Sequence, residues 1–354
     1  MRVLVTGATS LLGRVVTRRL LARGDDVTVF QRHPSGLRVR EVLGDVADRQ
    51  AVQVAVIGAE TVIHAAAKVA VVGRWAEFQK TNITGTANLL DAARMADVGR
   101  FVYVSSPSVA HTGASLVGAP AGPADPDATR GHYARSKAAA ELLALRTASP
   151  GFPVVAVRPH VVWGPGDTQL VGRIVARAQQ HRLAVIGSGA ALIDTTYIDN
   201  AADAIVATAD HATALGGRAL VVSNGQPRPV RELLCRITSA AGLDPPRLHV
   251  GALTARAAGT LLERAWQLAR RDDDPPLTRF LAEQLSTAHW FDQRETQRSL
   301  EWRPAVDLDE GFRRLESWFQ ASDARRETRH TAPLAWPVRR PTSRRRHSVM
   351  GGRR

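Results

Sequence analysis

The 354-residue chain has almost no cysteine and no long apolar run. Cys235 is the single cysteine, so an internal disulfide framework is excluded and a cytoplasmic setting is expected. A transmembrane helix needs about 18 or more consecutive apolar residues, and no such stretch exists. We also expect no secretory signal, because the opening apolar run is too short. A hydrophobic content of 44% with 23% charged residues is typical of a globular protein.

Lysine is also rare, although the chain is strongly basic. Three lysines stand against 44 arginines, and the net charge is +14, which first suggests a nucleic-acid partner. Ten of the arginines lie in residues 321–354, where only Asp323 and Glu327 oppose them. We therefore expect no nucleic-acid binding by the body of the protein. We predict a disordered basic tail over 321–354, either a solubilising end or a contact for an anionic partner.

The first 160 residues alternate short β-branched runs with longer helical patterns, which predicts βαβ units. The expected strands are Arg2–Thr6, Asp26–Phe30, Val39–Leu43, Thr61–His64, Arg100–Ser105 and Val154–Arg158, and the expected helices are Leu11–Arg23, Val46–Ile57, Trp75–Ala96 and His132–Ala148. This order predicts an α/β fold with a doubly wound parallel Rossmann sheet. Ligands of such sheets bind at the carboxyl ends of the strands.

After about residue 165 the pattern loosens and proline becomes frequent. We predict a dinucleotide-binding domain over 1–165, to which segments near 183–222 return. A smaller, interleaved C-terminal substrate lobe is expected over 166–320. Within it, residues 252–271 read as a helix on which Leu261, Leu262 and Trp266 share a face. That helix either packs on the lobe, or acts as a lid or as an interfacial helix in peripheral contact with a membrane.

A glycine turn follows the first strand immediately. Gly7 permits a tight turn, and Gly13 permits close packing of the next helix on the sheet. The helix N-terminus at Leu11 and Leu12 would present N–H groups to a pyrophosphate. Ser10 stands where another glycine is usual, and its hydroxyl could donate to a phosphate. The pattern predicts a dinucleotide site.

The residue at the end of the second strand helps to choose the cofactor. A carboxylate there accepts hydrogen bonds from the ribose of NAD, whereas an arginine suits the 2′-phosphate of NADP. Arg32 predicts NADP(H), and NAD is the alternative if Arg32 is only a solvated surface residue. Asp45 and Val46 are expected near the adenine. Ala65 and Ala66 would let the backbone approach the cofactor closely.

A tyrosine and a lysine lie four residues apart at the start of a predicted helix. Tyr133 and Lys137 therefore share one helix face. A neighbouring ammonium lowers the pKa of a phenol toward a working acid–base range. Ser106, at the end of the preceding strand, could hold a substrate carbonyl oxygen. With three lysines in the chain, Lys68 is notable too, either as a surface residue or as a contact for the cofactor or an anionic substrate group.

These residues resemble the extended short-chain dehydrogenase/reductase family over roughly residues 1–320. The matching positions are Thr6-Gly7-x-x-Ser10-x-x-Gly13, Asp45, Asn82, Ser106, Tyr133-x-x-x-Lys137, Arg158-Pro159-x-x-x-Trp163-Gly164, Tyr197-Ile198-Asp199-Asn200 and Leu300-x-Trp302-x-Pro304. The resemblance implies that Ser106, Tyr133 and Lys137 are a catalytic triad. It also implies that Asn82 supports them through a helix-bound water and that Pro159 contacts the cofactor. Ser10 and Glu301 replace usual glycines, outside the catalytic set.

Within that family the chain is similar to the 3β-hydroxysteroid dehydrogenase branch, and there to bacterial reductases of long-chain 2-alkyl-3-keto acids in olefin biosynthesis. This implies NADPH-dependent reduction of a lipid-like small molecule, with substrate contacts from Lys68, Ser108, His111 and Trp163 and no metal. The alternatives are a 3β-hydroxysteroid or sterol-4-carboxylate dehydrogenase using NAD(P), or a non-catalytic NADP-sensing protein. The intact triad argues against the last. A homodimer and an assembly with other pathway enzymes are left open.

Overall fold

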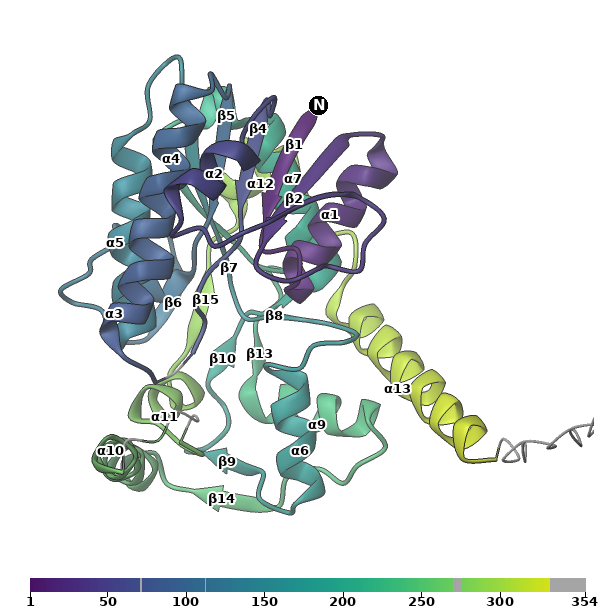
Figure 1. Cartoon of the computed structure of the whole chain (residues 1–354). Coiled ribbons are helices and arrows are strands. Elements are labelled where there is room, and N and C mark those ends of the chain that lie inside the picture. The colour runs from purple at the N-terminus through teal and green to yellow at the C-terminus, as the bar shows by residue number, and fades with distance from the viewer. Residues whose placement is uncertain (71, 112, 270, 272–274, 332–354) are drawn as a thin grey trace, which may run out of the picture.

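The computed structural model describes residues 1–70, 72–111, 113–269, 271 and 275–331. A parallel sheet of seven strands lies above a smaller lobe (Figure 1). Its strands, in spatial order, are β3 (Arg40–Leu43), β2 (Asp26–Gln31), β1 (Arg2–Thr6), β4 (Thr61–His64), β5 (Arg100–Val104), β7 (Val154–Pro159) and β12 (Ala219–Val222). This order confirms the expected Rossmann fold.

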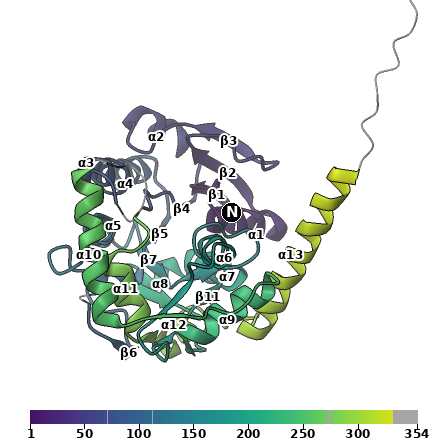
Figure 2. The ribbon, with the colours of Figure 1, turned by 90° about the horizontal axis from the view of Figure 1, so that it is seen from below.

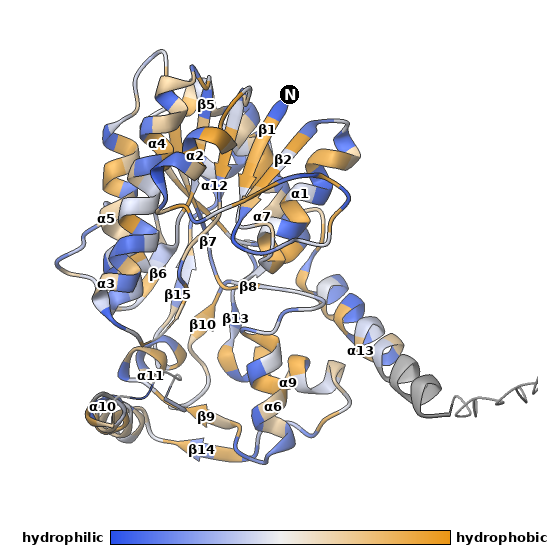
Figure 3. Ribbon diagram, viewed as in Figure 1, coloured by the Kyte–Doolittle hydropathy of each residue, from blue (hydrophilic) through white to orange (hydrophobic). Residues whose placement is uncertain are grey.

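Helices cover both faces of the sheet. The helices α1 (Leu11–Arg23) and α7 (Ile198–Asp210) lie on one face, and α2 (Arg49–Ala55), α4 (Gly85–Met95) and α5 (His132–Arg146) lie on the other. Side chains of a strand alternate between the faces, so Val3 and Val5 pack with Leu20 of α1, whereas Leu4 packs with Leu89 of α4. Figure 3 shows the apolar colouring of β1 and β2 that such two-sided burial requires.

The long helix expected over Trp75–Ala96 forms as three segments. A short helix α3 (Trp75–Phe78) runs into a π-helical turn η1 (Gln79–Thr84) and then into α4. The extra residue of the π turn buries Asn82, whose side-chain amide bonds to other segments. Such turns occur frequently at functional sites. The apolar periodicity of the sequence gave no sign of this interruption.

The smaller lobe combines short strands with helices. Its strands are β6 (Leu116–Ala119), β8 (Val162–Trp163), β9 (Ala184–Ile186), β10 (Leu192–Ile193), β11 (Thr196–Tyr197), β13 (Arg228–Pro229), β14 (Leu248–Val250) and β15 (His289–Phe291), and its main helices are α6 (Val171–Gln179), α9 (Val230–Ala240), α10 (Ala252–Leu268) and α11 (Arg279–Ser286). Strands β13, β10, β15 and β6 form one sheet in that order.

The chain crosses between the sheet and the smaller lobe several times. Residues 160–197, which include α6 and β8 to β11, belong to the smaller lobe. The chain then returns to the sheet, where α7 packs on α1 and β12 pairs with β7. The returning segment is therefore 198–222. Strand β9, which we had expected within the return, instead pairs with β14 in the smaller lobe. A further crossing brings α12 (Arg294–Ser299) to the sheet, where the Thr296 hydroxyl donates to the Val221 carbonyl at 2.8 Å.

Helix α10 packs against α11. A Cβ on Gly259 would lie 2.5 Å from the backbone of Thr278 and Arg279, so the two segments are in close contact. The opposite face leaves Leu253 and Leu261 exposed at 80% and 66%. Leu261 thus points away from the lobe, in contrast to the single shared face that we expected. In the described part of the chain, no helix combines the length and apolarity needed to cross a bilayer.

The C-terminal helix is longer than expected. Helix α13 (Leu308–Thr331) continues past residue 321, where we had placed the start of a disordered tail. In both ribbon views its last turns extend away from the body (Figures 1 and 2). The remainder of that predicted tail, 332–354, lies outside the described residues.

Candidate active site

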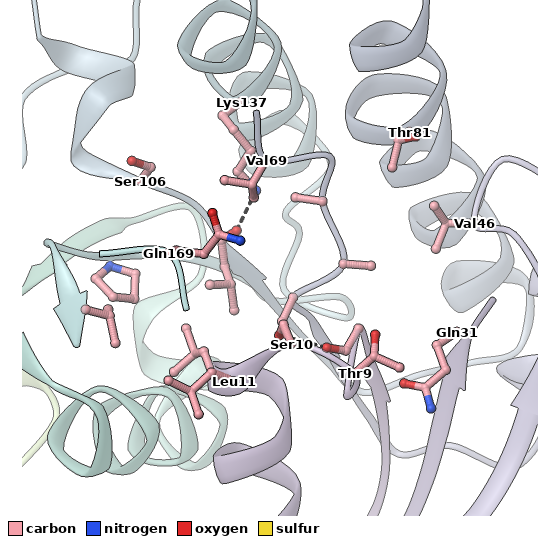
Figure 4. Close-up of a pocket in the computed structure, with 18 of the residues that line it drawn as sticks. Thr9, Ser10, Leu11, Gln31, Val46, Val69, Thr81, Ser106, Lys137 and Gln169 are labelled. Atoms are coloured by element: carbon pink, nitrogen blue, oxygen red, sulfur yellow. Dashed lines mark hydrogen bonds between the residues drawn. The ribbon is translucent and has the colours of Figure 1, made fainter. Parts of the chain in front are cut away.

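A cavity of about 470 Å³ opens at the carboxyl ends of the central strands (Figure 4). It brings together most of the residues expected at the cofactor and the reacting groups. The predicted residues that line it are Gly7, Ser10, Leu11, Leu12, Arg32, Asp45, Val46, Ala65, Ala66, Ser106, Tyr133, Lys137 and Pro159. Gly13 and Asn82 lie behind this lining. The cavity lies where a doubly wound sheet binds its ligands, at the carboxyl ends of the strands.

The glycine turn is tight enough to exclude side chains. Gly7 has a φ of +78°, and a Cβ there would lie 2.8 Å from the Ala66 backbone. A Cβ on Gly13 would lie 2.3 Å from the Gly7 carbonyl oxygen. The turn is therefore packed closely on the loop after β4, and the start of α1 lines the cavity, a position that fits a pyrophosphate.

The hydroxyl of Ser10 has a different role from the one expected. It caps α1 by accepting from the Gly13 N–H at 3.0 Å, and it donates to the Gly7 carbonyl at 2.8 Å. Its proton is therefore engaged within the turn, so the expectation that it donates to a phosphate is not supported. Helix capping explains why a serine stands here instead of glycine.

The far end of the cavity carries a guanidinium. Gln31, Arg32 and His33 line it at the end of β2, and none of them is a carboxylate. The nearby carboxylate of Glu41, on β3, already has hydrogen-bond partners within the protein. It accepts from the Gln31 amide at 2.6 Å and from the Ser35 N–H at 2.8 Å. The hydrogen bonds from Ser35 hold the pKa of Glu41 below its usual value. No other lining residue from this strand end offers a negative charge to the exposed Arg32.

Lys137 is buried below the reacting end of the cavity. Its ammonium donates to the Val104 carbonyl at 2.6 Å and lies 4.1 Å from the centre of the Tyr103 ring. Burial lowers the pKa of Lys137 to about 7, and the Glu141 carboxylate, one turn further along α5, acts in the opposite direction. Lys137 is thus positioned by the carboxyl end of β5.

Tyr133 and Ser106 are coupled to each other. Burial raises the pKa of the Tyr133 phenol, while a hydrogen bond with the Ser106 side chain acts against that rise. We had expected Lys137 to lower this pKa, but desolvation is the largest influence and the shift is upward. The Ser106 hydroxyl also lies 2.9 Å from the Ser108 hydroxyl, so Ser108 supports Ser106 without lining the cavity itself.

Asn82 joins the cavity wall to the helix that carries Tyr133. Its amide oxygen accepts from the Lys68 N–H at 2.7 Å, and its amide nitrogen donates to the Lys68 carbonyl at 3.2 Å. The same nitrogen donates to the Ser136 hydroxyl at 2.9 Å, which donates to the Tyr133 carbonyl at 2.8 Å. Asn82 therefore contacts α5 directly.

Three of the four expected substrate contacts lie away from the cavity, and the fourth, Ser108, is connected to it only through Ser106. The Lys68 ammonium pairs with Glu77 at 2.7 Å, and His111 is buried with its Nε2 3.0 Å from that of His289. Trp163 is buried in the core of the smaller lobe, where it stacks on Phe312. Lys68 is held by a carboxylate, Trp163 by an apolar core and His111 by a second buried histidine. None of these three residues lines this cavity or the adjoining second cavity described next.

A second cavity, of about 860 Å³, adjoins the first. Val69, Tyr133 and Gln169 line both, so the two spaces meet at the Tyr133 phenol. The wall of the second cavity includes Trp266 of α10 and Phe280 of α11, with several arginines. Sequence reasoning missed Gln169 and the arginines. The Gly-Pro-Gly turn at residues 164–166, a few residues after the predicted strand Val154–Arg158, was the available signal for Gln169.

No metal centre is found in the part of the chain that the structure describes. There, no group of three or more histidine, cysteine, aspartate or glutamate side chains is placed to hold a metal ion.

Comparisons with known proteins agree with this geometry. The profile of the NAD dependent epimerase/dehydratase family matches residues 3–223. A 2-alkyl-3-oxoalkanoate reductase of Stenotrophomonas maltophilia is 41% identical over 90% of this chain and 99% of its own length. A mouse sterol-4-alpha-carboxylate 3-dehydrogenase (decarboxylating) is 28% identical over 89% of this chain and 90% of its own length. The solved structure of MoeE5 with UDP-glucose and NAD has a TM-score of 0.69 at 24% identity, covering 91% of this chain and 99% of that one, and shares the fold.

Proposed function

Because the chain belongs to the NAD-dependent epimerase/dehydratase family, we propose that it reduces the 3-keto group of a long-chain 2-alkyl-3-oxoalkanoate to the 3-hydroxy acid, with NADPH as the reductant. It is an NAD(P)-dependent oxidoreductase of the extended short-chain dehydrogenase/reductase type. The observation that carries the proposal is the meeting of two cavities at Tyr133, one suited to a dinucleotide and one to a large partly apolar substrate. The reaction would serve long-chain olefin biosynthesis in the cytoplasm.

The proposed roles follow from the state of each side chain. When bound, the nicotinamide supplies the hydride. The Ser106 hydroxyl holds the carbonyl oxygen, and the Tyr133 phenol donates its proton to that oxygen as negative charge develops. The Tyr133 phenol shares a hydrogen bond with the Ser106 side chain, so both groups are placed to reach the same carbonyl oxygen. Lys137, held by the Val104 carbonyl, positions this end of the cavity and can bond a cofactor ribose.

NADPH is favoured over NADH by Arg32. Its exposed guanidinium at the end of β2 suits a 2′-phosphate, and no carboxylate lines that strand end to bind the ribose of NAD.

The second candidate is oxidation of a sterol-4-carboxylate, as the name of the mouse relative describes for that protein. The names of both relatives describe a carboxylate one carbon away from the reacting carbon. The arginines of the second cavity support an acidic substrate of this kind over a neutral 3β-hydroxysteroid.

The test is a spectrophotometric assay with a synthetic 2-alkyl-3-oxoalkanoate and either NADPH or NADH. We expect substrate-dependent loss of nicotinamide absorbance, faster with NADPH, and a 3-hydroxy acid as product. The Tyr133→Phe protein is the control for background reduction. Absence of turnover with the keto acid, together with NAD(P) reduction by a sterol carboxylate, would replace the proposal with the second candidate. Cofactor binding without turnover of either substrate would identify a non-catalytic binding protein.

A further inference from the structure

We infer that Gln169 and Arg173, which line the second cavity from α6 and the loop before it, bind the carboxylate of the substrate and select β-keto acids over neutral ketones. The inference rests on the proposed function and adds a recognition site to it.

The two side chains lie in order along the path from Tyr133 into the second cavity. Gln169 lines both cavities, as Tyr133 does, whereas Arg173 lines only the second. Figure 4 shows the Gln169 side chain directed into the first cavity, on the side of Lys137 and Ser106. Arg173 lies in the first turn of α6, four residues after Gln169, which stands in the turn before that helix, and both line the second cavity. A group just beyond the reacting carbonyl would meet Gln169 first and Arg173 next.

The backbone N–H groups at the start of α6 already have a partner, so an anion would be bound by the side chains. The Asp167 carboxylate accepts from the N–H groups of Gln169 at 2.8 Å and of Val171 at 2.9 Å. The free end of α6 is therefore already capped, and its backbone is not what an anion would bind. The side-chain amide of Gln169 is exposed and makes no hydrogen bond within the described residues.

The second cavity is basic. Its wall carries five arginines, namely Arg74, Arg130, Arg173, Arg271 and Arg279, against the single carboxylate of Glu263. The Glu263 carboxylate itself accepts a hydrogen bond from the Arg279 N–H at 3.0 Å. A cavity with this balance favours an anionic ligand over a neutral one.

Several of these arginines have acids of their own. Glu283 pairs with Arg279 at 3.0 Å and with Arg130 at 2.5 Å, and Glu77 pairs with Arg74 at 2.9 Å. Arg173 takes part in an interaction within the protein as well. A guanidinium has five N–H donors, so Arg173 can share them with a substrate carboxylate.

The charge of Arg173 acts on its surroundings. After burial, it is the second cause that lowers the pKa of Arg177, one turn further along α6. Arg173 and Arg177 thus place two positive charges one turn apart along α6.

The chemistry of a β-keto acid matches this arrangement. Its carboxyl carbon is attached to the carbon next to the carbonyl, so a carbonyl at Ser106 and Tyr133 places the carboxylate immediately beyond them. Loss of CO₂ from such an acid breaks the bond between C1 and C2, and the electron pair moves toward the 3-oxygen. A guanidinium bound to the carboxylate stabilises the negative charge on that group. Because loss of CO₂ moves this charge to the 3-oxygen, the guanidinium opposes the loss. Gln169 and Arg173 would thus both select the acid and protect it.

The experiment compares an acid with its neutral analogue. We would measure kcat/KM for a 2-alkyl-3-oxoalkanoate and for its methyl ester, with NADPH, in the wild type and in Arg173→Gln, Arg173→Lys and Gln169→Leu. Hydrogen bonds to charged groups contribute about 1.5–3 kcal/mol, so Arg173→Gln should lower kcat/KM for the acid about 10- to 100-fold. The ester should change little. Arg173→Lys should recover part of the loss, and Gln169→Leu should lose less than Arg173→Gln.

Two controls separate recognition from damage to the fold. Arg182→Gln removes an exposed arginine that lines neither cavity, and it should leave both substrates unaffected. NADPH binding, followed by fluorescence, should be unchanged in the Arg173 variants, because Arg173 lines only the second cavity. The fraction of ketone released by decarboxylation should rise in Arg173→Gln.

Failure of the carboxylate site and failure of the proposed function would give different results. A wild type that reduces acid and ester equally well, or an Arg173→Gln protein with an unaltered ratio of acid to ester, overturns the carboxylate site and leaves the ketoreductase intact. A wild type that reduces neither compound overturns the proposed function, and the inference with it.

Discussion

The side-chain amide of Asn82 donates a hydrogen bond of 2.9 Å to the hydroxyl of Ser136. This bond ties the π-helical turn η1 to α5, the helix that carries Tyr133 and Lys137. Because Asn82 also bonds both backbone groups of Lys68, the loop that follows β4 and the helix α5 are held at a fixed spacing. The cofactor wall and the proposed proton donor are therefore positioned by one side chain.

Replacing Asn82 with alanine should disturb both stability and turnover. The Lys68 N–H would lose its acceptor in a partly buried setting, and leaving such a group without a partner costs about 1–3 kcal/mol. We expect a loss of that size in urea unfolding, and a larger fall in kcat than rise in the KM for NADPH, because α5 is displaced. Ser136→Ala, which removes only one of the three bonds, should have a smaller effect on both. A kcat equal to that of the wild type would argue against a positioning role.

Tyr133→Phe should remove the proton donor and leave the cavity shape nearly unchanged. General acid catalysis contributes about 10²–10⁴-fold, so kcat should fall by that factor while the Kd for NADPH stays close to the wild-type value. Turnover would be measured by absorbance and binding by fluorescence. Substantial activity in this variant would assign the proton to another group.

Arg32→Gln should reverse the cofactor preference. Loss of a charge-assisted bond to the 2′-phosphate should raise the KM for NADPH about 10- to 100-fold, with little change for NADH. Arg40→Gln on the neighbouring strand is a matched control, because Arg40 is exposed, pairs with Asp26 and does not line the cavity. Equal effects on NADPH and NADH would show that Arg32 does not bind the 2′-phosphate.

The buried pair of Arg158 on β7 and Glu141 on α5 should be essential for stability. Arg158 is 1% exposed, and its Nε donates to Glu141 at 2.9 Å. Removing one member, as in Glu141→Leu, leaves an unpaired buried charge and should cost about 3–5 kcal/mol. The double variant Glu141→Leu with Arg158→Met should recover much of the loss. Urea unfolding of the wild type, the single variants Glu141→Leu and Arg158→Met and the double variant checks this, and a stable single variant would contradict it.

Lys137 should make stability depend on pH. Its folded pKa of about 7 lies below the unfolded value of 10.5, so between these values the unfolded chain binds more protons. Stability from this group therefore rises with pH across that window, by about 1.4 kcal/mol per unit. The free energy of unfolding of the wild type minus that of Lys137→Met should increase from pH 7.5 to 9.5. Lys80→Met, at an exposed lysine, should show no such trend.

The sequence predicted those parts of the fold that local periodicity determines. Strands such as Arg2–Thr6 and Thr61–His64 and the helix Leu11–Arg23 have the predicted bounds, because each is apolar with one clear period and ends at a glycine or a polar residue. The side chains gathered by the strand ends, such as Ser106 and Lys137, were predictable for the same reason.

Other features depend on contacts between distant segments. Nothing local distinguishes Trp163 as a substrate contact from Trp163 as a core residue, and its partner Phe312 lies far along the chain. The π turn at Asn82 is stabilised by bonds to Lys68 and Ser136, which no periodicity reports. The direction of the Tyr133 pKa shift depends on burial, which only the fold reveals.

The return of the chain through α7 and β12 has a consequence for attempts to change specificity. The residues that form the second cavity come from segments both before and after that return, among them Arg173 and Trp266. A contiguous block spanning them would also carry β12, the edge strand of the nucleotide-binding sheet. The substrate lobe therefore cannot be exchanged between relatives as one contiguous segment of sequence. New specificities must be built by separate grafts on either side of residues 198–222.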